Sequence, residues 1–522
     1  MKILKSSFVL LLFFLSFQIV LGKNIELTSF QILTDTLPNP KNEDVLIREL
    51  PLGADKKVAL PAETRAIFPM DTSVRLGKME NGLNYYVKHL PSGNRKWAKC
   101  YLVVKAGFAM EADDQIGAAT AVKHLVLKET EDMMEPFVRF EHTGLSGDDD
   151  YEDVIKTFSG FEETIFEYST PILEIAQLSS ALSVLKTWAS EAVLDPAWIE
   201  KERLNVIKNS PRLYGISTIL QNKTVFAGTR YGDRIPADIS AKLKELKPGA
   251  IKKFYNEWYR PDLMAVVIVG NNDVDITEQE LIKVFSEIKK PVSKVPDTSA
   301  NYVDGQILKT DIMANAQFTD SEVRILFQNQ KRPVRDQFGY RQLIMNELIN
   351  VMFQERFKTA EFKLSGVRKP GFLRPSGNTE FLFVNLFCSE GKVIEYLKPA
   401  LIEIDRLRKI GFTEAELEKA KIYIGQKHSS EKDLTDDHQI DAMSEKMIWH
   451  YLDGEPLLDV HTQEEILKNY LPKIKLNEIN KKFAQLTKEE NCCILIKGNS
   501  GSIGTLSDAS QIKKLIEEVR IK

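Results

Sequence analysis

The sequence has few cysteines for its length. Four occur in 522 residues, Cys100, Cys388, Cys492 and Cys493, which is too few and too scattered for a disulfide framework, although export would permit one bridge. Cys492 and Cys493 adjoin in a segment typical of a strand, so at least one of them is expected to point inward as a small apolar residue. A metal site built from these thiols is not expected.

A charge excess of either sign is also missing. Lys and Arg total 70 against 74 Asp and Glu, a formal net charge of −4. Because binding to nucleic acid needs a basic field, a nucleic-acid partner has no support in the composition. With 43% hydrophobic and 28% charged residues, the chain is an ordinary globular sequence, long enough for two or three compact domains.

Apolar runs of membrane-spanning length are absent from the sequence. A run from Phe8 to Leu21, behind Lys2 and Lys5 and ahead of the small residue Gly22, is too short to cross a bilayer comfortably. Residues 1–22 are therefore predicted to be a cleavable signal peptide. The mature protein is expected to be secreted or periplasmic, with no membrane span.

The rest of the chain divides into an arm and two regions. Residues 23–70 hold five prolines among polar residues, which predicts an irregular N-terminal arm. Ordered structure should begin near Asp71. A polar passage over 289–305 is the best domain boundary and gives domains at 71–290 and 306–522. The second region is similar to the first in order and length, without a convincing residue-level repeat.

Hydrophobic periodicity and turn signals predict both strands and helices in each region. Asp195 followed by Pro196 is a typical helix start, because Asp caps the first turn and Pro tolerates its first position. Strands are predicted at 82–89, 99–106, 263–270 and 380–387. Helices are predicted at 116–127, 171–193, 197–209, 249–259, 337–357, 393–409 and 414–426.

Five short segments follow one another in a set order through the first region. They are DTSVRLGKMENGLNYYV at 71–87, EADDQIG at 111–117, FEET at 161–164, KER at 201–203 and FYNEWYRPD at 254–262. In sequence and in order, these segments resemble those of the zinc metallopeptidase family of pitrilysin, insulysin and the mitochondrial processing peptidase. The resemblance implies an α+β fold of two related domains, each an antiparallel sheet backed by helices. Together they would form one bowl-shaped half of a clamshell that active members close around an unfolded peptide.

The helix that carries the family's metal chemistry is degraded in this sequence. Active members have an H-x-x-E-H helix. By resemblance, the first histidine ligand falls on Thr120, the catalytic glutamate on Lys123, the second histidine on His124 and the third ligand, a glutamate, on Asn209. A catalytic zinc usually has three protein ligands, drawn from Cys, His and carboxylates. One remaining ligand does not hold a metal, so no catalytic residue and no cofactor is expected.

Lys123 adds a second obstacle to zinc chemistry. A cation at this position would repel the metal by several kcal/mol, on the order of Coulomb estimates at an effective dielectric of about 20. While protonated, it also cannot accept a proton from water. His124 is then expected to serve packing or a hydrogen bond, and Glu202 to be a helix-surface carboxylate paired within its own helix.

Peptide docking beside this helix depends on an edge strand. The family's substrate-binding Asn-Ala pair falls on Lys156 and Thr157, which puts docking through these side chains in doubt. Strand addition, however, relies on backbone groups and does not need those side chains.

Other polar residues were weighed as sites. His142 with Asp148, Asp149 and Asp150 could be imagined as replacement ligands, but a run of acids is typical of a solvated loop. Asn222 opens an N-glycosylation pattern, which matters only if a eukaryote secretes the chain. Surface or packing roles are expected for three histidines whose spacing does not share one helical face closely: His428, His438 and His450.

The resemblance and the lost chemistry together predict binding instead of catalysis. We expect an exported, inactive homologue that pairs with an active family member and helps to hold unfolded peptides; the sequence has length for one half only. Two alternatives stay open. One is a secreted zinc metalloendopeptidase whose ligands come from unrecognised positions or from a partner, and the other is a stand-alone secreted binding module. Stoichiometric zinc would indicate the first, and the lack of a co-purifying active homologue would indicate the second.

Overall fold

The computed structural model describes most of the chain from residue 68 onward. The described residues are 68–91, 97–130, 155–172, 174–209, 223–227, 229–234, 239–295, 309–314, 318, 321–331, 334, 336–358, 367–376, 379–389, 391–430, 436–499, 501, 503, 506 and 508–520. The predicted signal peptide, nearly all of the arm, His142, Asp148 to Asp150 and Asn222 lie outside them. None of the described helices is long and apolar enough to cross a membrane.

A six-stranded sheet organises the first half of the chain, in the order β1-β2-β6-β3-β5-β4. All neighbouring strands are antiparallel except β2 and β6, which are parallel. Its central strand, β6, is buried at every residue, which explains why its sequence is a continuous apolar run instead of an alternating one. The strands are β1 (Arg75–Lys78), β2 (Asn84–His89), β3 (Trp97–Val104), β4 (Ile155–Ser159), β5 (Thr164–Pro171) and β6 (Met264–Gly270).

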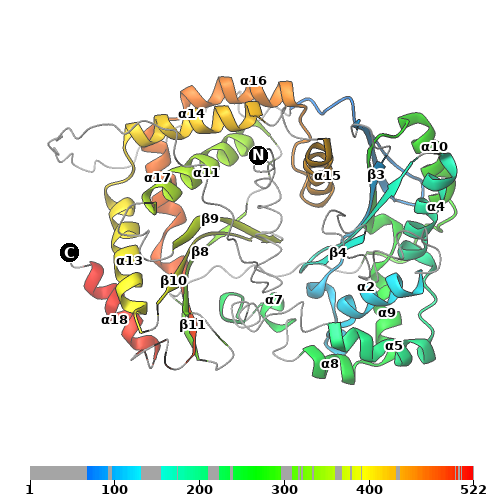
Figure 1. Cartoon of the computed structure of the whole chain (residues 1–522), viewed down its shortest axis with the longest axis horizontal. Coiled ribbons are helices and arrows are strands. Elements are labelled where there is room, and N and C mark those ends of the chain that lie inside the picture. The colour runs from blue at the N-terminus through cyan, green and yellow to red at the C-terminus, as the bar shows by residue number, and fades with distance from the viewer. Residues whose placement is uncertain are drawn as a thin grey trace, which may run out of the picture.

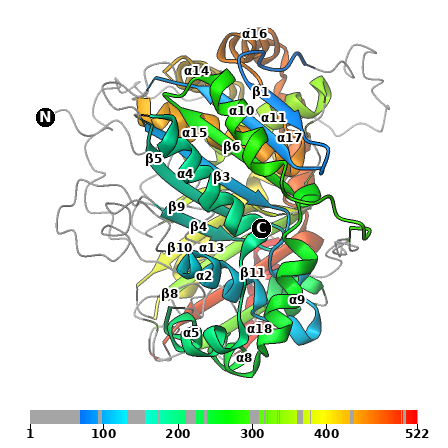
Figure 2. The ribbon, with the colours of Figure 1, turned by 90° about the vertical axis from the view of Figure 1, so that its right-hand side faces the viewer.

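Helices cover the outer face of this sheet. In Figure 2, α4 and α10 lie across its strands, and the two helices also contact each other. The helix α2 packs against α5, α9 and β4. The helices are α2 (Ala118–Glu129), α4 (Ile175–Lys186), α5 (Pro196–Asn209), α7 (Arg230–Asp233), α8 (Ile239–Glu245), α9 (Pro248–Trp258) and α10 (Val274–Phe285). Short turns of other helix types are η2 (Phe108–Met110), η3 (Asp113–Gln115), η5 (Thr187–Glu191) and η7 (Pro261–Leu263).

A five-stranded sheet organises the second half, in the order β7-β11-β8-β10-β9. The helices α11, α13, α17 and α18 pack on its outer face. The strands are β7 (Lys309–Ala314), β8 (Ser321–Gln330), β9 (Val367–Ser376), β10 (Thr379–Cys388) and β11 (Cys492–Gly498). The helices are α11 (Gln337–Arg356), α13 (Val393–Lys409), α14 (Glu414–Ser430), α15 (Asp436–Asp453), α16 (Val460–Tyr470), α17 (Leu476–Leu486) and α18 (Ala509–Arg520), with the turns η9 (Leu471–Lys473) and η10 (Glu489–Asn491).

The two sheets repeat one topology. The series β2-β6-β3-β5-β4 in the first sheet and β7-β11-β8-β10-β9 in the second both begin with a parallel pair and continue with antiparallel pairs. The predicted fold class is therefore confirmed: two related α+β units, each a largely antiparallel sheet backed by helices. The repeat is one of backbone topology, which is why the sequence carries no matching residue pattern. The domain limits at 71–290 and 306–522 stay a prediction.

The inner face of the first sheet is covered by a helix from the second half. Val103, Val267 and Val269 on the sheet pack against Met447 and Ile448 of α15. Figure 1 shows the helices of both halves on the outside, the sheets toward the middle, and α15 and α7 between them. Because α15 belongs to the second half and packs on the sheet of the first, the two halves share a hydrophobic core.

The elements predicted from the sequence are present. The predicted strands correspond to β2, β3, β6 and β10, and the predicted helices to α2, α4, α5, α9, α11, α13 and α14. The start of α5 is as expected, since the backbone N–H groups of Ala197 and Trp198 donate to Asp195 Oδ1 at 2.9 and 3.1 Å. Both Cys492 and Cys493 are buried, and all four cysteines are free thiols.

Candidate functional site

The helix α2 begins at a buried, strongly constrained turn. Its N-cap residue Gly117 has φ 98°, a left-handed conformation that favours glycine. The carboxylate of Glu111 accepts hydrogen bonds from the backbone N–H groups of Gly117 and Ala119 at 2.9 and 2.8 Å. Burial raises the pKa of Glu111 to about 8. This contact fixes where α2 starts, so the positions of Thr120, Lys123 and His124 are set by the fold.

Thr120 and Lys123 lie in the interior of the protein. They are one turn apart on one face of α2, with exposed fractions of 1% and 3%. No described residue lies within hydrogen-bonding or ion-pair distance of the Lys123 ammonium, and burial alone lowers its pKa to about 8. Where the resemblance places the general base, the chain therefore has a buried lysine with no ion-pair partner among the described residues.

His124 is mostly buried and neutral. Burial, together with the positive charge of Lys123, lowers the pKa of His124 to about 3. Its Nε2 atom is enclosed and has no hydrogen-bond partner among the described residues. The predicted packing role is compatible with this position. The alternative prediction, a hydrogen bond, is not met at Nε2 by any described residue.

The second predicted ligand helix, α5, packs against α2. Asn209 is its last residue, but the side chain of Asn209 lies outside what the structure describes. Glu202 accepts a hydrogen bond from Asn205 Nδ2 at 2.8 Å, so it is paired within its own helix as predicted. It is only 8% exposed, so the prediction of a surface position was wrong; contact with neighbouring elements buries it.

The residues on α2 do not fit a zinc ion. The donor chemistry there consists of one hydroxyl, one imidazole and an ammonium, and an ammonium has no lone pair with which to bind a metal. No group of three or more His, Cys, Asp or Glu side chains that could hold a metal occurs within the described ranges. His124 is therefore the single residue of Thr120, Lys123 and His124 that offers a donor zinc favours, and a catalytic zinc usually needs three.

The strand β4 offers a backbone edge beside this helix. It is the last strand of its sheet and pairs only with β5 among the described strands, with Lys156 opposite Glu167 and Thr157 opposite Phe166. An edge strand presents unpaired N–H and C=O groups to which another extended chain can add. Because α2 contacts β4, this edge lies close to the helix that carries Lys123.

A polar cluster that the sequence did not reveal joins the two halves. The Tyr231 hydroxyl of α7 donates to Glu162 in the turn between β4 and β5, and Lys331 after β8 pairs with Asp453 at the end of α15. Burial, reinforced by the negative charge of Glu162, raises the pKa of the adjacent Glu163 to about 8. These residues are distant in sequence, so only the tertiary fold brings their charges together.

Two of the three histidines weighed in the second half, His428 and His450, have structural partners. His428 on α14 contacts Glu347 at 3.5 Å through Nε2 and Gln463 at 2.9 Å through Nδ1. His450 Nδ1 lies 2.6 Å from the Glu455 carbonyl oxygen. His438 is partly buried on α15. The three do not form one site, as their spacing predicted.

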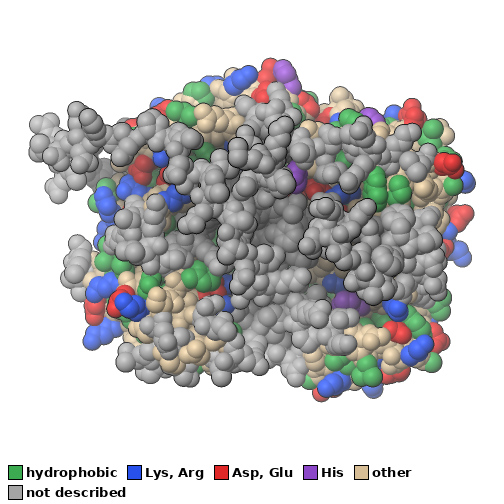
Figure 3. Space-filling view, viewed as in Figure 1, with side chains coloured by type: hydrophobic (Ala, Val, Ile, Leu, Met, Phe, Trp, Pro, Cys, Tyr) green, Lys and Arg blue, Asp and Glu red, His purple; other side chains and the backbone are tan. Residues whose placement is uncertain are grey.

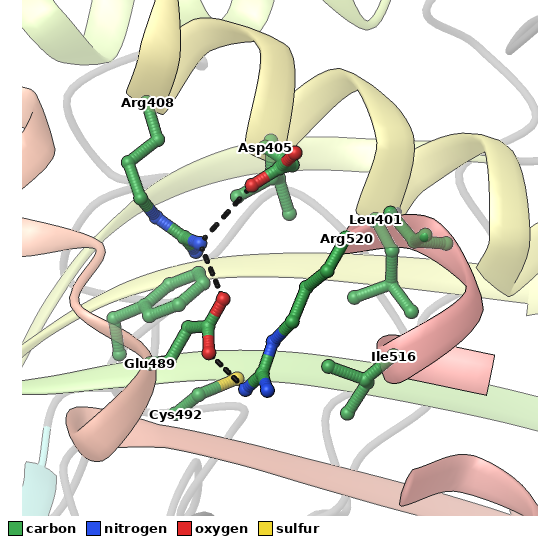
Figure 4. Close-up of a pocket in the computed structure, with 10 residues that line it drawn as sticks. Leu401, Asp405, Arg408, Glu489, Cys492, Ile516 and Arg520 are labelled. Atoms are coloured by element: carbon green, nitrogen blue, oxygen red, sulfur yellow. Dashed lines mark hydrogen bonds and ion pairs between the residues drawn. The ribbon is translucent and has the colours of Figure 1, made fainter. Parts of the chain in front are cut away.

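Described residues of the second half line two small cavities. One of about 30 Å³ is lined by residues of α13, β11 and α18, with an ion-pair chain from Asp405 through Arg408 and Glu489 to Arg520 across its mouth (Figure 4). The other, of about 20 Å³, lies on the inner face of the second sheet beside Glu322. A cavity of about this size holds one or two water molecules, so neither is a peptide site.

The described surface carries mixed charges. In Figure 3, Lys and Arg side chains alternate with Asp and Glu around the rim of the face shown, without a large patch of one sign. This agrees with the net charge of −4, and the described side chains of this face give no support for an acidic or basic macromolecular partner.

Comparison with known proteins gives a consistent family match. Residues 245–423 match the family model described as the Peptidase M16 inactive domain. Over 424 residues, the chain is 24% identical to a protein named "Zinc protease PQQL-like" from Arabidopsis thaliana, covering 80% of this chain and 41% of that protein. It is 21% identical to "Probable zinc protease PqqL" from Escherichia coli, covering 82% of this chain and 46% of that protein. The chain therefore spans less than half the length of these relatives.

Solved structures show the same fold. The crystal structure of the first half of the periplasmic protease PqqL from Escherichia coli superposes with a TM-score of 0.73 at 18% identity, covering 88% of this chain and 98% of that one. A predicted insulinase family protease from Yersinia pestis gives a TM-score of 0.68 at 16% identity, covering 89% of this chain and 99% of that one.

Proposed function

We propose that this chain, which is similar to M16 peptidases over most of its length, is an exported, non-catalytic half of a peptide-binding assembly. In this proposal it pairs with an active family member and completes the chamber in which that member holds an unfolded peptide. Its own α2 supplies no catalysis. The observation that carries the proposal is the burial of Lys123, at the position of the family's base, with no counter-ion in the part of the chain that the structure describes.

Lys123 opposes hydrolysis in two ways. A metal-bound water needs a base that can take its proton, and a protonated ammonium has no free lone pair. A positive charge inside the protein also raises the free energy of placing a dication next to it, because Coulomb repulsion is stronger at low dielectric. Thr120 and Asn209 cannot offset this effect, since neither provides the imidazole or carboxylate that zinc prefers.

Peptide binding by this half is supported by the edge of β4. Strand addition uses main-chain hydrogen bonds, so it does not depend on the residues lost from α2. Pairing is proposed by analogy: the matched relatives are more than twice as long as the part that this chain matches, so in those proteins the matched part is accompanied by further chain of similar length. Export follows from the predicted signal peptide and agrees with the periplasmic location named for the Escherichia coli relative.

A copurification experiment tests the pairing. The chain, tagged at its C-terminus and expressed in its native source, is isolated under mild conditions, and its partners are identified by mass spectrometry. We expect an M16 member with an intact H-x-x-E-H helix in amounts comparable to the chain, and loss of peptidase activity from that fraction when the chain is depleted. The isolated chain, sized by light scattering, provides the control.

A stable monomer with no family member among its partners would contradict the pairing and favour a stand-alone binding module. Peptidase activity of the isolated chain that requires zinc would instead favour the alternative of an active enzyme, in keeping with the zinc-protease names of its relatives.

A further inference from the structure

Lys123 differs from the other deeply buried lysines of the structure. Lys99, 8% exposed, contacts Asp441 at 2.6 Å and Glu167 at 3.5 Å. Lys331, also 8% exposed, pairs with Asp453. Lys123 is 3% exposed and has no anion beside it within the described part of the chain. Buried charges are normally paired, so the missing counter-ion of Lys123 requires an explanation.

Other polar groups near Lys123 also lack hydrogen-bond partners among the described residues. The enclosed Nε2 atom of the adjacent His124 has no partner among described residues. The helix that carries both residues contacts β4, whose outer edge is unpaired in the described sheet. Within the described part of the chain, a buried ammonium, an imidazole nitrogen without a partner and an unpaired strand edge thus belong to two elements in direct contact.

We propose that Lys123 is the receptor for the C-terminal carboxylate of an extended peptide that adds to the edge of β4. This inference rests on the proposed peptide-binding function and names the class of ligand: chains that end within the site, with a free terminal carboxyl group. The ammonium supplies the charge-assisted hydrogen bond, and strand addition aligns the preceding residues.

The charge balance favours this ligand over other anions. One ammonium matches one carboxylate, whereas a phosphate carries a charge closer to −2 and is usually held by several donors. Five residues of β4 pair with a similar number of peptide residues, which satisfy backbone groups but leave the chain terminus charged. The terminus is therefore the one part of an uncharged peptide that needs Lys123.

The test uses two nonapeptide pools, randomised over uncharged residues and labelled with fluorescein at the N-terminus. One pool ends in a free carboxylate and the other in an amide, so side-chain carboxylates are excluded as a source of binding. Fluorescence anisotropy measures both pools on the full chain and on Lys123→Met. Lys128→Met is the matched control, because Lys128 is an exposed residue on the same helix.

We expect the free-acid pool to bind the native chain roughly ten to a hundred times more tightly than the amidated pool, the range for a hydrogen bond to a charged group. Lys123→Met should abolish that ratio without changing the affinity for the amidated pool, and Lys128→Met should preserve it. Equal binding of the two pools to the native chain, or a preference that survives Lys123→Met, overturns the carboxylate receptor alone. Failure of both pools to bind overturns the proposed peptide-binding function as well.

Discussion

Replacing Lys123 by methionine should stabilise the protein. The pKa of the buried ammonium is lowered from 10.5 to about 8, so keeping it protonated at pH 7 costs about 3 kcal/mol at 1.36 kcal/mol per pKa unit. Methionine has a similar length, no charge and a flexible apolar chain that fills the same space. We therefore expect the free energy of unfolding to rise by up to about 3 kcal/mol, and the melting temperature to rise by roughly 2 to 4 °C for each kcal/mol in domains of 150–250 residues.

The assay compares urea and thermal unfolding of the native chain, Lys123→Met and a matched control, Lys99→Met. Lys99 is buried to a similar extent but paired with Asp441 and Glu167. Its replacement leaves two carboxylates without their cation, which should lower stability by roughly 3 kcal/mol. Opposite signs for the two variants would support an unpaired charge at Lys123. A destabilised Lys123→Met, with Lys99→Met behaving as expected, would refute the reasoning, because it would mean that Lys123 has a stabilising partner.

Three further predictions follow from other sites. Burial would raise the pKa of Glu322, but the charges of Arg324 and Lys497 outweigh that effect and lower the pKa to about 2. Because the folded pKa is below the unfolded one, the ionised carboxylate stabilises the fold above pH 4.5, and this contribution is lost as the pH falls toward 2. Glu322→Gln should therefore flatten the plot of unfolding free energy against pH over that range, whereas Glu395→Gln, a control at an exposed site, should not. Gly117→Ala should destabilise the chain by roughly 1 to 2 kcal/mol in thermal unfolding, since alanine disfavours the φ of 98° there, whereas Gly249→Ala, which meets no atom within 4 Å and does not need a positive φ, should not. Thr120→His with Asn209→Glu should create measurable zinc affinity in a calorimetric titration if the two helices keep the family geometry, and failure of a folded double variant to bind zinc would mean that the scaffold has drifted.

Local structure could be predicted from the sequence where local physics determines it. The Asp195 cap set the start of α5, and the apolar run at 263–270 predicted the strand β6. The family resemblance placed Thr120, Lys123 and His124 on one helix. These predictions depended on short-range patterns, which the tertiary fold preserved.

Long-range structure could not be predicted in the same way. Met447 and Ile448 of α15 pack against Val267 and Val269 of the first sheet, more than 170 positions earlier in the chain. No local sequence pattern indicates that contact. The burial of Lys123 was equally hidden, because periodicity assigns a lysine to a solvated face. The contact between Tyr231 and Glu162 arises only when α7 meets the turn between β4 and β5.

The central claim, that this chain does not itself cleave peptides, is tested most directly by a hydrolysis assay. The purified chain is supplied with zinc and a fluorescence-quenched peptide pool, with an active M16 member as the positive control. The account predicts no cleavage by this chain that a chelator abolishes. Turnover that requires zinc, stops with chelator and returns when zinc is restored would contradict it.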